Sequence, residues 1–534
     1  MIKNKGKWIA LTLVVFVILD VVNGNTYSIM NVESMVYLSV FVLIIAGILF
    51  LNKENYKKFF GTFGIILTAF LITFIIGGFM SSKLFNAKRF ANVIGDVQEV
   101  DYAQLYGNDR EIEMSYVDKD SAIIAADKKL GELSDASSRF RIDYEEFSQI
   151  NYDGNMVRVA PLEYSDTFKK YTNLGAGVPY YVMVTTGDGA VNAKAELITL
   201  PEPMQYYPGA PFFKDLHRHV SINHKFSYLD DYYFEVDNQG HPYWIVQVIT
   251  KRVGIWGAKD MAALITVDAV SGETKRYGLE DVPEWVDSIY PTDMLMNQAK
   301  DYYTLSGGFI NSMTQQRGVM AIDSVEGAYN YVMIDGEIYI FTGIRPIALE
   351  SSSTTGMLFM NKRTGQAIEL ELPGVSIPSA EVTSIGTIQE KGYIPTTPVL
   401  MNIGGFPTYV MSLKDVSGVV RGFSYVNYQD YTKSSVGDTV AQTEKNYLNI
   451  MGDSESLAPE DHDKGEGVIE DIVPIITDGN TVYLIRMVGD ETIYSAPISV
   501  NDLLAFIKPN DIVIFEYSGN RIYEIDKKPV VTPS

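Results

Sequence analysis

Three long apolar runs dominate the hydrophobic pattern at the start of the chain. They read "WIALTLVVFVILDVV" at 8–22, "MVYLSVFVLIIAGILFL" at 35–51 and "FFGTFGIILTAFLITFIIGGFM" at 59–80. A bilayer core about 30 Å thick needs about 20 helical residues. The third run meets this length fully, the second just meets it, and the first is short. We therefore predict that residues 1–80 form a three-helix transmembrane anchor in contact with the lipid bilayer.

The first run leaves two alternatives open. A cleavable signal peptide would also explain residues 8–22, but no small-x-small cleavage site follows the run, whereas two further spans do. Asp20 lies near the end of this run. It is either an intramembrane functional carboxylate or, in the interpretation we favour, a residue at the outer headgroup level where its charge stays hydrated.

The lysines near these runs predict the orientation of the anchor. "MIKNKGK" precedes the first run and "NKENYKK" precedes the third, whereas "NGNTYSIMNVES" between the first and second has no Lys or Arg. Positively charged loops stay on the cytoplasmic side. We therefore expect the protein in the cell (plasma) membrane, with a cytoplasmic N-terminus and residues 81–534 extracytoplasmic.

Beyond the anchor the pattern changes to short alternating strands and single amphipathic helices. We predict a stalk at 81–114, where charges mix with scattered apolar residues, and a first α+β unit at 115–202. "DKDSAIIAADKKLGEL" (118–133) has helical spacing, with Asp118 or Ser121 at its start as a cap. The pattern predicts strands after it, with a turn at Gly187-Asp188-Gly189.

Two later stretches repeat one plan. "LITVDAVSGETKRY" (264–277) and "LFMNKRTGQAIEL" (358–370) each read as strand, Ser/Thr-Gly turn and strand. Each follows another hairpin and precedes a predicted helix, and the glycine supplies the positive φ that a tight turn needs. We predict α+β units at 203–320 and 321–450, each an antiparallel sheet covered by a helix, produced by duplication.

The C-terminal pattern is that of a small barrel. Residues 451–466 read as an acidic linker rich in Gly, Pro and Ser. Residues 467–528 read as three strands, a helix at 499–507 and two strands, which is the order of an OB-like five-stranded β-barrel. An SH3-like barrel is the alternative fold.

Composition removes several kinds of chemistry. The chain has no cysteine, which excludes disulfides, thiolate zinc sites, Fe–S clusters and Cys nucleophiles. Its net charge is −23, and residues 1–80 carry six Lys and three acids, so the excess of acid lies in the outer region. Polyanion binding needs clustered Lys or Arg, so we expect no nucleic acid as a partner. No nucleophile elbow, phosphate loop, dinucleotide fingerprint or His-Glu-x-x-His is present, and we expect no cofactor and no catalytic residues.

Two sets of residues are candidate sites. His217, His219 and His224 in "HRHVSINH" lie close in sequence; on a strand, the first two would share one face and form part of a zinc-like set. The alternative, which we favour, is a hydrated surface rich in Tyr and His. Ile255 and Trp256 in the Gly-flanked stretch "VGIWGAKD" (253–260) form a candidate protein-docking loop, with a packed aromatic plug as the equal alternative.

Some of these stretches resemble known families. "VDAVSGE" (267–273) after a central strand resembles the PepSY-type module of bacterial envelope proteins, in which a helix packs on a small antiparallel sheet. Over most of residues 1–450 the chain resembles a group of Gram-positive bacterial multi-span membrane proteins with PepSY-like extracytoplasmic repeats. The stretches that carry this second likeness are "LGELSD" (130–135), "RVAPLEY" (158–164), "HPYWIV" (241–246) and "VPEWVD" (282–287).

The resemblance implies topology rather than chemistry. PepSY-type modules are thought to act as regulators or binders, often of proteases, and bring no catalytic residues with them. The sequence therefore favours a membrane-anchored extracytoplasmic binding, scaffold or regulatory protein with an envelope protein as its partner. The alternatives are a cell-envelope hydrolase that uses unassigned carboxylates, and a subunit of an envelope transport or secretion complex.

Overall fold

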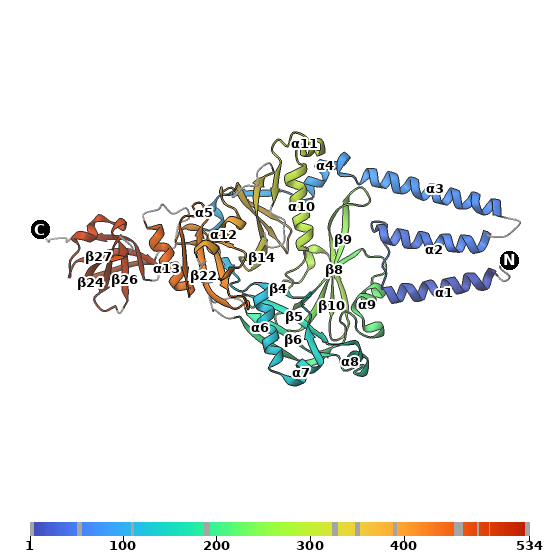
Figure 1. The fold of residues 1–534 in the computed structure, drawn as a ribbon, viewed down its shortest axis with the longest axis horizontal. Coiled ribbons are helices and arrows are strands. Elements are labelled where there is room, and N and C mark those ends of the chain that lie inside the picture. The colour runs from blue at the N-terminus through green and yellow to red at the C-terminus, as the bar shows by residue number, and fades with distance from the viewer. Residues whose placement is uncertain are drawn as a thin grey trace. The chain divides into compact units, whose positions relative to one another are not determined.

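A computed structural model gives the fold. It describes residues 5–528 except 51–55, 108–109, 111, 186–192, 323–328, 348–352, 388–391, 453–462, 478–479, 491 and 519. The chain is of the mixed α+β class, with long apolar helices followed by antiparallel sheets (Figure 1). It divides into a large unit (1–100, 112–379 and 414–420) and a small unit (101–111, 380–413 and 421–534), which we describe separately.

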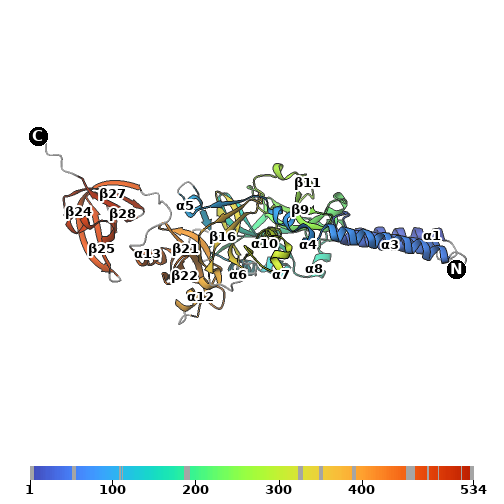
Figure 2. The ribbon, with the colours of Figure 1, turned by 90° about the horizontal axis from the view of Figure 1, so that it is seen from above.

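The large unit begins with the three apolar helices that the sequence predicts: α1 (Lys5–Asn23), α2 (Val32–Phe50) and α3 (Tyr56–Met80). Each is long and apolar enough to cross a membrane. They lie side by side in one layer, seen face-on in Figure 1 and edge-on in Figure 2. Phe16 of α1 stacks on Tyr37 and Phe41 of α2, with ring centroids 5.3 and 3.9 Å apart.

The predicted stalk at 81–114 is wrong. This segment forms α4 (Lys83–Ala91), η1 (Asn92–Ile94), β1 (Val97–Val100), α5 (Tyr102–Leu105) and β2 (Ile112–Met114). Strand β1 pairs in parallel with β17 (Ala367–Leu370), and β2 pairs with β13 (Tyr329–Ile334). The apolar residues look scattered in sequence because each short element buries only a few side chains, such as Phe90, Val100 and Met114.

The first sheet follows two short helices. Its elements are α6 (Lys119–Gly131), α7 (Ser134–Arg139), β3 (Phe140–Ile142), β4 (Ser148–Tyr152), β5 (Asn155–Tyr164), α8 (Thr167–Thr172), β6 (Val178–Thr185) and β7 (Lys194–Met204). The strand order is β3-β5-β6-β7, and β4 also pairs with β5. Asp118 caps α6 by accepting a hydrogen bond from the Ser121 N–H, as predicted. The predicted turn at 187–189 lies outside the described residues.

The second and third sheets carry the two predicted repeats. The second sheet has order β11-β10-β9-β8, and the third contains the run β17-β16-β14-β13. Both Ser/Thr-Gly hairpins form as predicted, between β10 and β11 and between β16 and β17. The elements are η2 (Phe212–Lys214), α9 (Leu216–Asn223), β8 (Leu229–Val236), β9 (Pro242–Val253), β10 (Gly257–Asp268), β11 (Thr274–Tyr277), η3 (Leu279–Asp281), α10 (Thr292–Leu305), α11 (Phe309–Met313), β12 (Met320–Ile322), β14 (Glu337–Pro346), β15 (Ser353–Thr354), β16 (Gly356–Asn361) and β18 (Gly374–Val375).

The two hairpins match in detail. Strand pairing places Asp268 opposite Tyr243 and Asn361 opposite Tyr339. In both, the side-chain oxygen of the Asp or Asn accepts hydrogen bonds from the backbone N–H groups two and three residues on. These shared contacts support the predicted duplication.

A tyrosine ring covers the glycine of each turn. Gly272 and Gly365 have φ of +79° and +75°. A Cβ at Gly272 would lie 2.3 Å from Tyr206, and one at Gly365 would lie 2.8 Å from Tyr290. Both the positive φ and the space under the ring therefore require glycine.

Helices α6, α9 and α10 each precede strands of the sheet that they cover, which corrects the predicted order of hairpins and then helix. Leu295 and Ala299 of α10 pack with Ile340 and Leu358 of the third sheet, although Met294 also reaches the second. Helices α6 and α9 contribute to a core that the first and second sheets share. The predicted boundary at 202/203 therefore does not separate two cores, and the predicted unit 321–450 is divided between the large and small units.

The small unit contains a fourth sheet. Its elements are most of α12 (Ile377–Thr387), β19 (Ile394–Pro395), β20 (Val399–Ile403), β21 (Phe406–Lys414), β22 (Val420–Asn427), β23 (Ser434–Gly437) and α13 (Val440–Met451). The order is β19-β21-β22-β23, with β20 also on β21. Ser384 of α12 contacts Ser424 of β22, and the Tyr447 hydroxyl of α13 bonds Thr408 and Asn427.

The C-terminal strands pair in the order β24-β25-β26-β28-β27, and β27 pairs back with β24. They are β24 (Asp463–Thr477), β25 (Asn480–Met487), β26 (Ile493–Pro497), β27 (Ile512–Ser518) and β28 (Arg521–Lys527). A single residue pair, Ser495 with Arg521, joins β26 to β28. The predicted helix at 499–507 is wrong in type, because η4 (Ile498–Val500) and η5 (Asp502–Phe506) are 3₁₀ turns. Most of the predicted linker at 451–466 lies outside the described residues.

Candidate functional site

The candidate docking loop at Ile255 and Trp256 lies against the chain's own membrane helices. The Trp256 ring packs on Phe74 of α3 with centroids 5.2 Å apart, and it leaves no room for a Cβ at Gly77. Its indole N–H donates to the Ile29 carbonyl at 3.1 Å, in the loop between α1 and α2. This placement is that of the packed aromatic plug, and it joins α3, the α1–α2 loop and the second sheet.

The backbone of the same loop is held by one serine. Ser81, directly after α3, accepts hydrogen bonds through its hydroxyl from the N–H groups of Ile255 and Trp256, at 3.1 and 2.9 Å. Because Gly254 has φ of +62° and lies against the Met80 carbonyl, the loop backbone approaches the end of α3 closely. The loop therefore positions the C-terminal end of α3.

The three candidate histidines lie on and after a helix rather than on a strand. His217 and His219 are in α9, and His224 follows its end. Residues two apart on a helix point to nearly opposite sides, so the predicted shared face does not form. The segment is helical because Asp215 caps it by accepting from the Arg218 N–H, and Leu216 and Val220 provide a helical apolar stripe.

Each histidine instead has its own local contacts. The His217 ring packs on Tyr232, and burial lowers the pKa of its imidazole. The His219 Nε2 lies 2.7 Å from the Gly272 carbonyl, which ties α9 to the repeated turn. Burial also lowers the pKa of His224, whose Nε2 has no hydrogen-bond partner in the described part of the chain. Among the described residues, no group of three or more His, Asp or Glu is arranged to hold a metal ion.

A second set of contacts joins the C-terminal end of α1 to α9. The Arg218 guanidinium donates to the carbonyls of Val21 and Val22, at 3.1 and 3.2 Å, in the last turn of α1. The Lys225 ammonium lies 2.7 Å from the Asp20 carboxylate, and Tyr27 also bonds Asp20. Asp20 therefore sits in a polar cluster at the C-terminal end of α1, beside Tyr27 and Lys225.

Several buried charged and polar side chains form a cluster that the sequence did not predict. We call Glu235, Asp287, Ser288 and Lys362 the polar junction. The Glu235 side chain is fully buried and accepts from the backbone N–H groups of Asp287 and Ser288, at 3.0 and 2.8 Å. The Lys362 ammonium donates to the Ser288 hydroxyl at 3.1 Å. Asp287 in turn accepts from the backbone N–H of Asn151 in β4 at 2.6 Å.

The polar junction lies where three sheets meet. Glu235 belongs to the second sheet, Asn151 to the first, and Lys362 to the turn after β16 in the third. Burial raises the pKa of the Asp287 carboxyl well above its ordinary value, and the negative charge of Glu235 adds to this. Buried carboxylates with shifted pKa values can mark an active site. Here both carboxylates accept hydrogen bonds from backbone N–H groups, so the geometry favours a structural role in holding the three sheets together.

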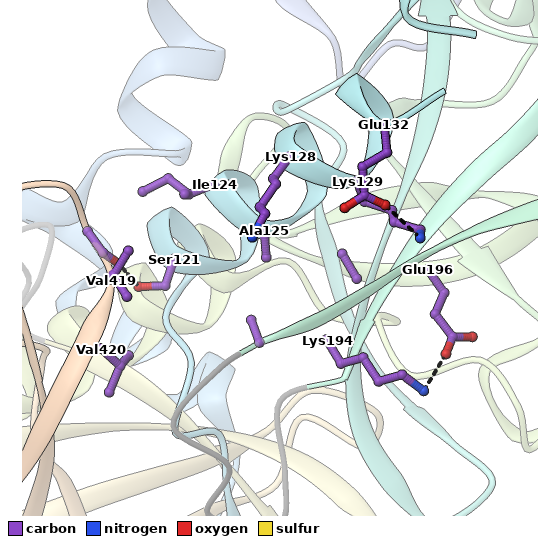
Figure 3. Close-up of a pocket in the computed structure, with 13 residues that line it drawn as sticks. Ser121, Ile124, Ala125, Lys128, Lys129, Glu132, Lys194, Glu196, Val419 and Val420 are labelled. Atoms are coloured by element: carbon purple, nitrogen blue, oxygen red, sulfur yellow. Dashed lines mark hydrogen bonds and ion pairs between the residues drawn. The ribbon is translucent and has the colours of Figure 1, made fainter. Parts of the chain in front are cut away.

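An open groove lies beside the first sheet of the large unit. It has a cavity volume of about 580 Å³ and runs between α6, β7 and the hairpin at 414–420 (Figure 3). Ser121, Ile124 and Lys128 line it from α6, Lys194 and Glu196 from β7, and Val419 from the hairpin. We call it the α6–β7 groove. The Ser121 hydroxyl donates to the Gly418 carbonyl at 3.0 Å, and Lys414 pairs with Asp118, which holds the hairpin on α6.

Two features of the α6–β7 groove suit a peptide. Strand β7 is the last in its sheet, and no strand among the described residues pairs with its outer edge, so its backbone groups there are available. Figure 3 shows two ion pairs along the wall, Lys129 with Glu132 at 3.0 Å and Lys194 with Glu196 at 2.6 Å. Lys128 has no ion pair with any described residue, so the groove keeps one uncompensated positive charge.

Comparisons with known proteins add no identification. No protein-family model and no curated protein matches the chain. Cobalt-substituted Synechocystis apocarotenoid oxygenase aligns over 57% of this chain and 61% of its own, with 10% identity and a TM-score of 0.15. Trypanosoma rangeli sialidase in complex with 2,3-difluorosialic acid aligns over 65% of this chain and 43% of its own, with 10% identity and a TM-score of 0.13. The chain thus spans less than two thirds of either protein, and TM-scores this low carry no argument about fold or activity.

Proposed function

We propose that this chain is a membrane-anchored extracytoplasmic binding protein of the cell envelope, without catalytic activity of its own. Its α6–β7 groove would receive an extended, acidic segment of another envelope protein. The observation that carries this proposal is the unpaired outer edge of β7 along an open cavity. An added strand would bond the β7 backbone, while its alternate side chains enter the groove.

The charge of the groove supports an acidic ligand. Lys128 is the lysine without an ion pair among the described residues that line the groove, and the wall around it holds two compensated pairs. A carboxylate on the incoming strand would pair with Lys128 at an exposed site, where such a pair contributes about 0.2–1 kcal/mol. Selectivity would come from this charge, whereas most of the affinity would come from backbone hydrogen bonds.

The proposed topology follows the lysines. Helix α1 begins at Lys5, and α3 carries Lys57 and Lys58 in its first turn, whereas the opposite ends of α1 and α3 contact α9 and the Trp256 loop. With the positive ends cytoplasmic, the sheets lie outside the cell. A tag fused after Ser534 should be cleaved by protease added to intact, wall-stripped cells. Protection of that tag would contradict the topology.

The arrangement of modules agrees with a binding role. The repeated sheet-and-helix units are similar in plan to PepSY-type modules, and the C-terminal strand order is that of an OB-like barrel, which we propose as a further protein-docking module. The alternative of an envelope hydrolase would need accessible carboxylates. The buried pair Glu235 and Asp287 is instead bonded to backbone N–H groups, which favours binding over hydrolysis.

A photo-cross-linking amino acid in place of Ala195 tests the groove in living cells. Ala195 lines the groove on β7, and the matched control replaces Lys275 on β11, an edge strand of the second sheet. We expect position 195 to form an adduct that mass spectrometry maps to an acidic, extended segment of one protein. Lys128→Glu should reduce the yield several-fold. Equal adducts at 195 and 275, or an adduct insensitive to Lys128→Glu, would contradict the proposal.

A further inference from the structure

The outer ends of the membrane helices are surrounded by elements that carry large exposed apolar side chains. Phe85 of α4 is 63% exposed, and Phe226, just after α9, is 85% exposed. Leu84, Phe212, Phe213 and Ile222 on the same elements are exposed as well, and so is Ile29 in the loop between α1 and α2. We call α4 and the segment 211–228 the base of the outer region. Exposed apolar side chains gathered on neighbouring elements mark an interaction surface.

The base is continuous with the apolar surface of the membrane helices. The Phe85 ring packs on Phe79, a lipid-facing residue in the last turn of α3, with centroids 5.5 Å apart. Segment 211–228 is fastened to the last turn of α1 through Arg218 and Lys225. Because the spans end at these contacts, the base lies at the depth where hydrocarbon gives way to headgroups.

The opposite face of α4 is fixed to the protein. Ala87, Phe90 and Ala91 are buried with Val253 of β9 and Leu305 of α10. The Ser82 side chain caps the helix start by accepting from the Leu84 N–H. Rotation of α4 to hide Phe85 would therefore break a packed core, so the apolar residues of the base remain outward without a cover from this unit.

The base is also basic, in contrast to the acidic outer region as a whole. Residues 81–95 contain Lys83, Lys88 and Arg89 and no acid, and residues 211–228 contain three Lys or Arg and one Asp. Aromatic side chains flanked by Lys and Arg are typical of segments that lie in the interface of a bilayer. Clustered basic residues next to a span attract anionic headgroups.

We propose that the base rests in the outer leaflet around the three helices and binds anionic phospholipid headgroups. Phe85 and Phe226 would insert at the level of the headgroups, while Lys88 and Arg89 would contact the phosphates. The outer region would then be held against the membrane surface at a fixed orientation. This inference rests on the proposed spanning helices, but it does not depend on the α6–β7 groove.

The absence of cysteine makes the test direct, because one introduced cysteine is unique. Phe85→Cys, Phe226→Cys and Val416→Cys would each carry a nitroxide in the full chain, reconstituted in nanodiscs of phosphatidylcholine with or without phosphatidylglycerol. Val416 is 92% exposed on the hairpin at 414–420, which makes it the control for exposure alone. In closed vesicles whose outer surface carries the sheets, protection of residues 51–55 from added protease would establish separately that the helices span the bilayer.

We expect nitroxides at 85 and 226 to collide several-fold more often with oxygen than with a water-soluble nickel chelate, and the one at 416 to show the reverse. Phosphatidylglycerol should increase the effect, and Lys88→Gln with Arg89→Gln should remove that increase. Water accessibility at 85 and 226 equal to that at 416 would overturn the proposal. If the collision rates do not respond to phosphatidylglycerol, anionic headgroups are not the ligand. If the nitroxides at 85 and 226 are shielded from water only in native membranes and not in nanodiscs, another protein covers the base and the proposal is overturned.

Discussion

The two copies of the Ser/Thr-Gly hairpin share a backbone and differ in what their side chains do. In both, a tyrosine that precedes a helix covers the turn glycine, and its backbone N–H donates to the carbonyl at the same position of the turn, Ala269 in one copy and Lys362 in the other. Ala269 is buried in the shared core of the first and second sheets. Lys362 instead extends into the polar junction. The charged connection is thus present in one of the two hairpins only.

The side chains that contact Asp268 and its equivalent Asn361 differ as well. Asp268 in the first copy lies 3.0 Å from His241, whereas the equivalent Asn361 donates to Glu337. His241 and Glu337 occupy the same register position, because Asp268 pairs with Tyr243 and Asn361 with Tyr339. The comparison teaches that the turn geometry is set by backbone contacts, while the side chains around it are free to specialise. Three sets of substitutions test this, from the largest expected effect to the smallest.

Loss of the junction lysine should have the largest effect. Lys362→Met keeps most of the side-chain volume but leaves Glu235 and Asp287 buried without their cation, which should lower the free energy of unfolding by about 3–5 kcal/mol. Denaturant unfolding of the full chain, followed by tryptophan fluorescence, measures this. Lys128→Met in the open groove is the control and should change stability by less than about 0.5 kcal/mol. Similar values for the two variants would show that the polar junction contributes little.

The glycines under the tyrosine rings should come second. Gly272→Ala and Gly365→Ala each place a Cβ in the left-handed region and against an aromatic ring, so each should cost about 2–3 kcal/mol. Gly154→Ala serves as control, since Gly154 has φ of +79° but no atom within 4 Å of an added Cβ, and should cost about 1 kcal/mol. If all three variants lose the same stability, the tyrosine covers are not close-packed.

The smallest effect should come from Asp268→Asn, which gives the first hairpin the side chain that Asn361 has in the second. Burial alone would raise the pKa of the Asp268 carboxyl, but hydrogen bonds from Ser271 and His241 lower it below its ordinary value. Because the folded-state pKa is depressed, Asp268 stabilises the fold above its unfolded-state pKa of about 3.9, and this contribution is lost as pH falls through the folded pKa.

Asp268→Asn should therefore cost less than about 1 kcal/mol at pH 7, since the site is partly exposed to solvent. The cost should shrink toward zero as the pH falls through the depressed pKa of the Asp268 carboxyl. Unfolding curves of the full chain between pH 2 and 7, for the native chain and the variant, measure this difference. A cost that stays constant over that range would show that the turn depends on the shape of the residue and not on its charge.

Much of the fold could be predicted from local pattern. The apolar runs, the hairpins at 264–277 and 358–370, and the Asp118 cap depend on residues adjacent in sequence, and each forms as predicted. The stalk could not be recognised as structured, because β1 and β2 pair with strands more than two hundred residues later. Likewise, α9 was missed because it is a short helix with only two buried apolar residues, Leu216 and Val220, and because the His-x-His pattern suggested a strand.

The sites were harder to predict than the elements. Glu235 lies in a strand buried on both faces, so its burial follows from the packing of other sheets and not from the alternation within β8. One sequence signal pointed to Lys362, because the equivalent position of the first turn holds Ala269, which is buried. The α6–β7 groove depends on a hairpin about 220 residues away in sequence, and no local pattern identifies such a surface.

The placement of each helix before the sheet that it covers has a consequence for synthesis. A chain that emerges from its N-terminus delivers α6, α9, α10 and α12 ahead of the strands that they protect. The helix that packs on each of these sheets is thus already present when the strands appear, and the first sheet completes its core when the second is added. For a protein that folds without disulfides, this order shortens the interval in which nascent sheets are prone to aggregate.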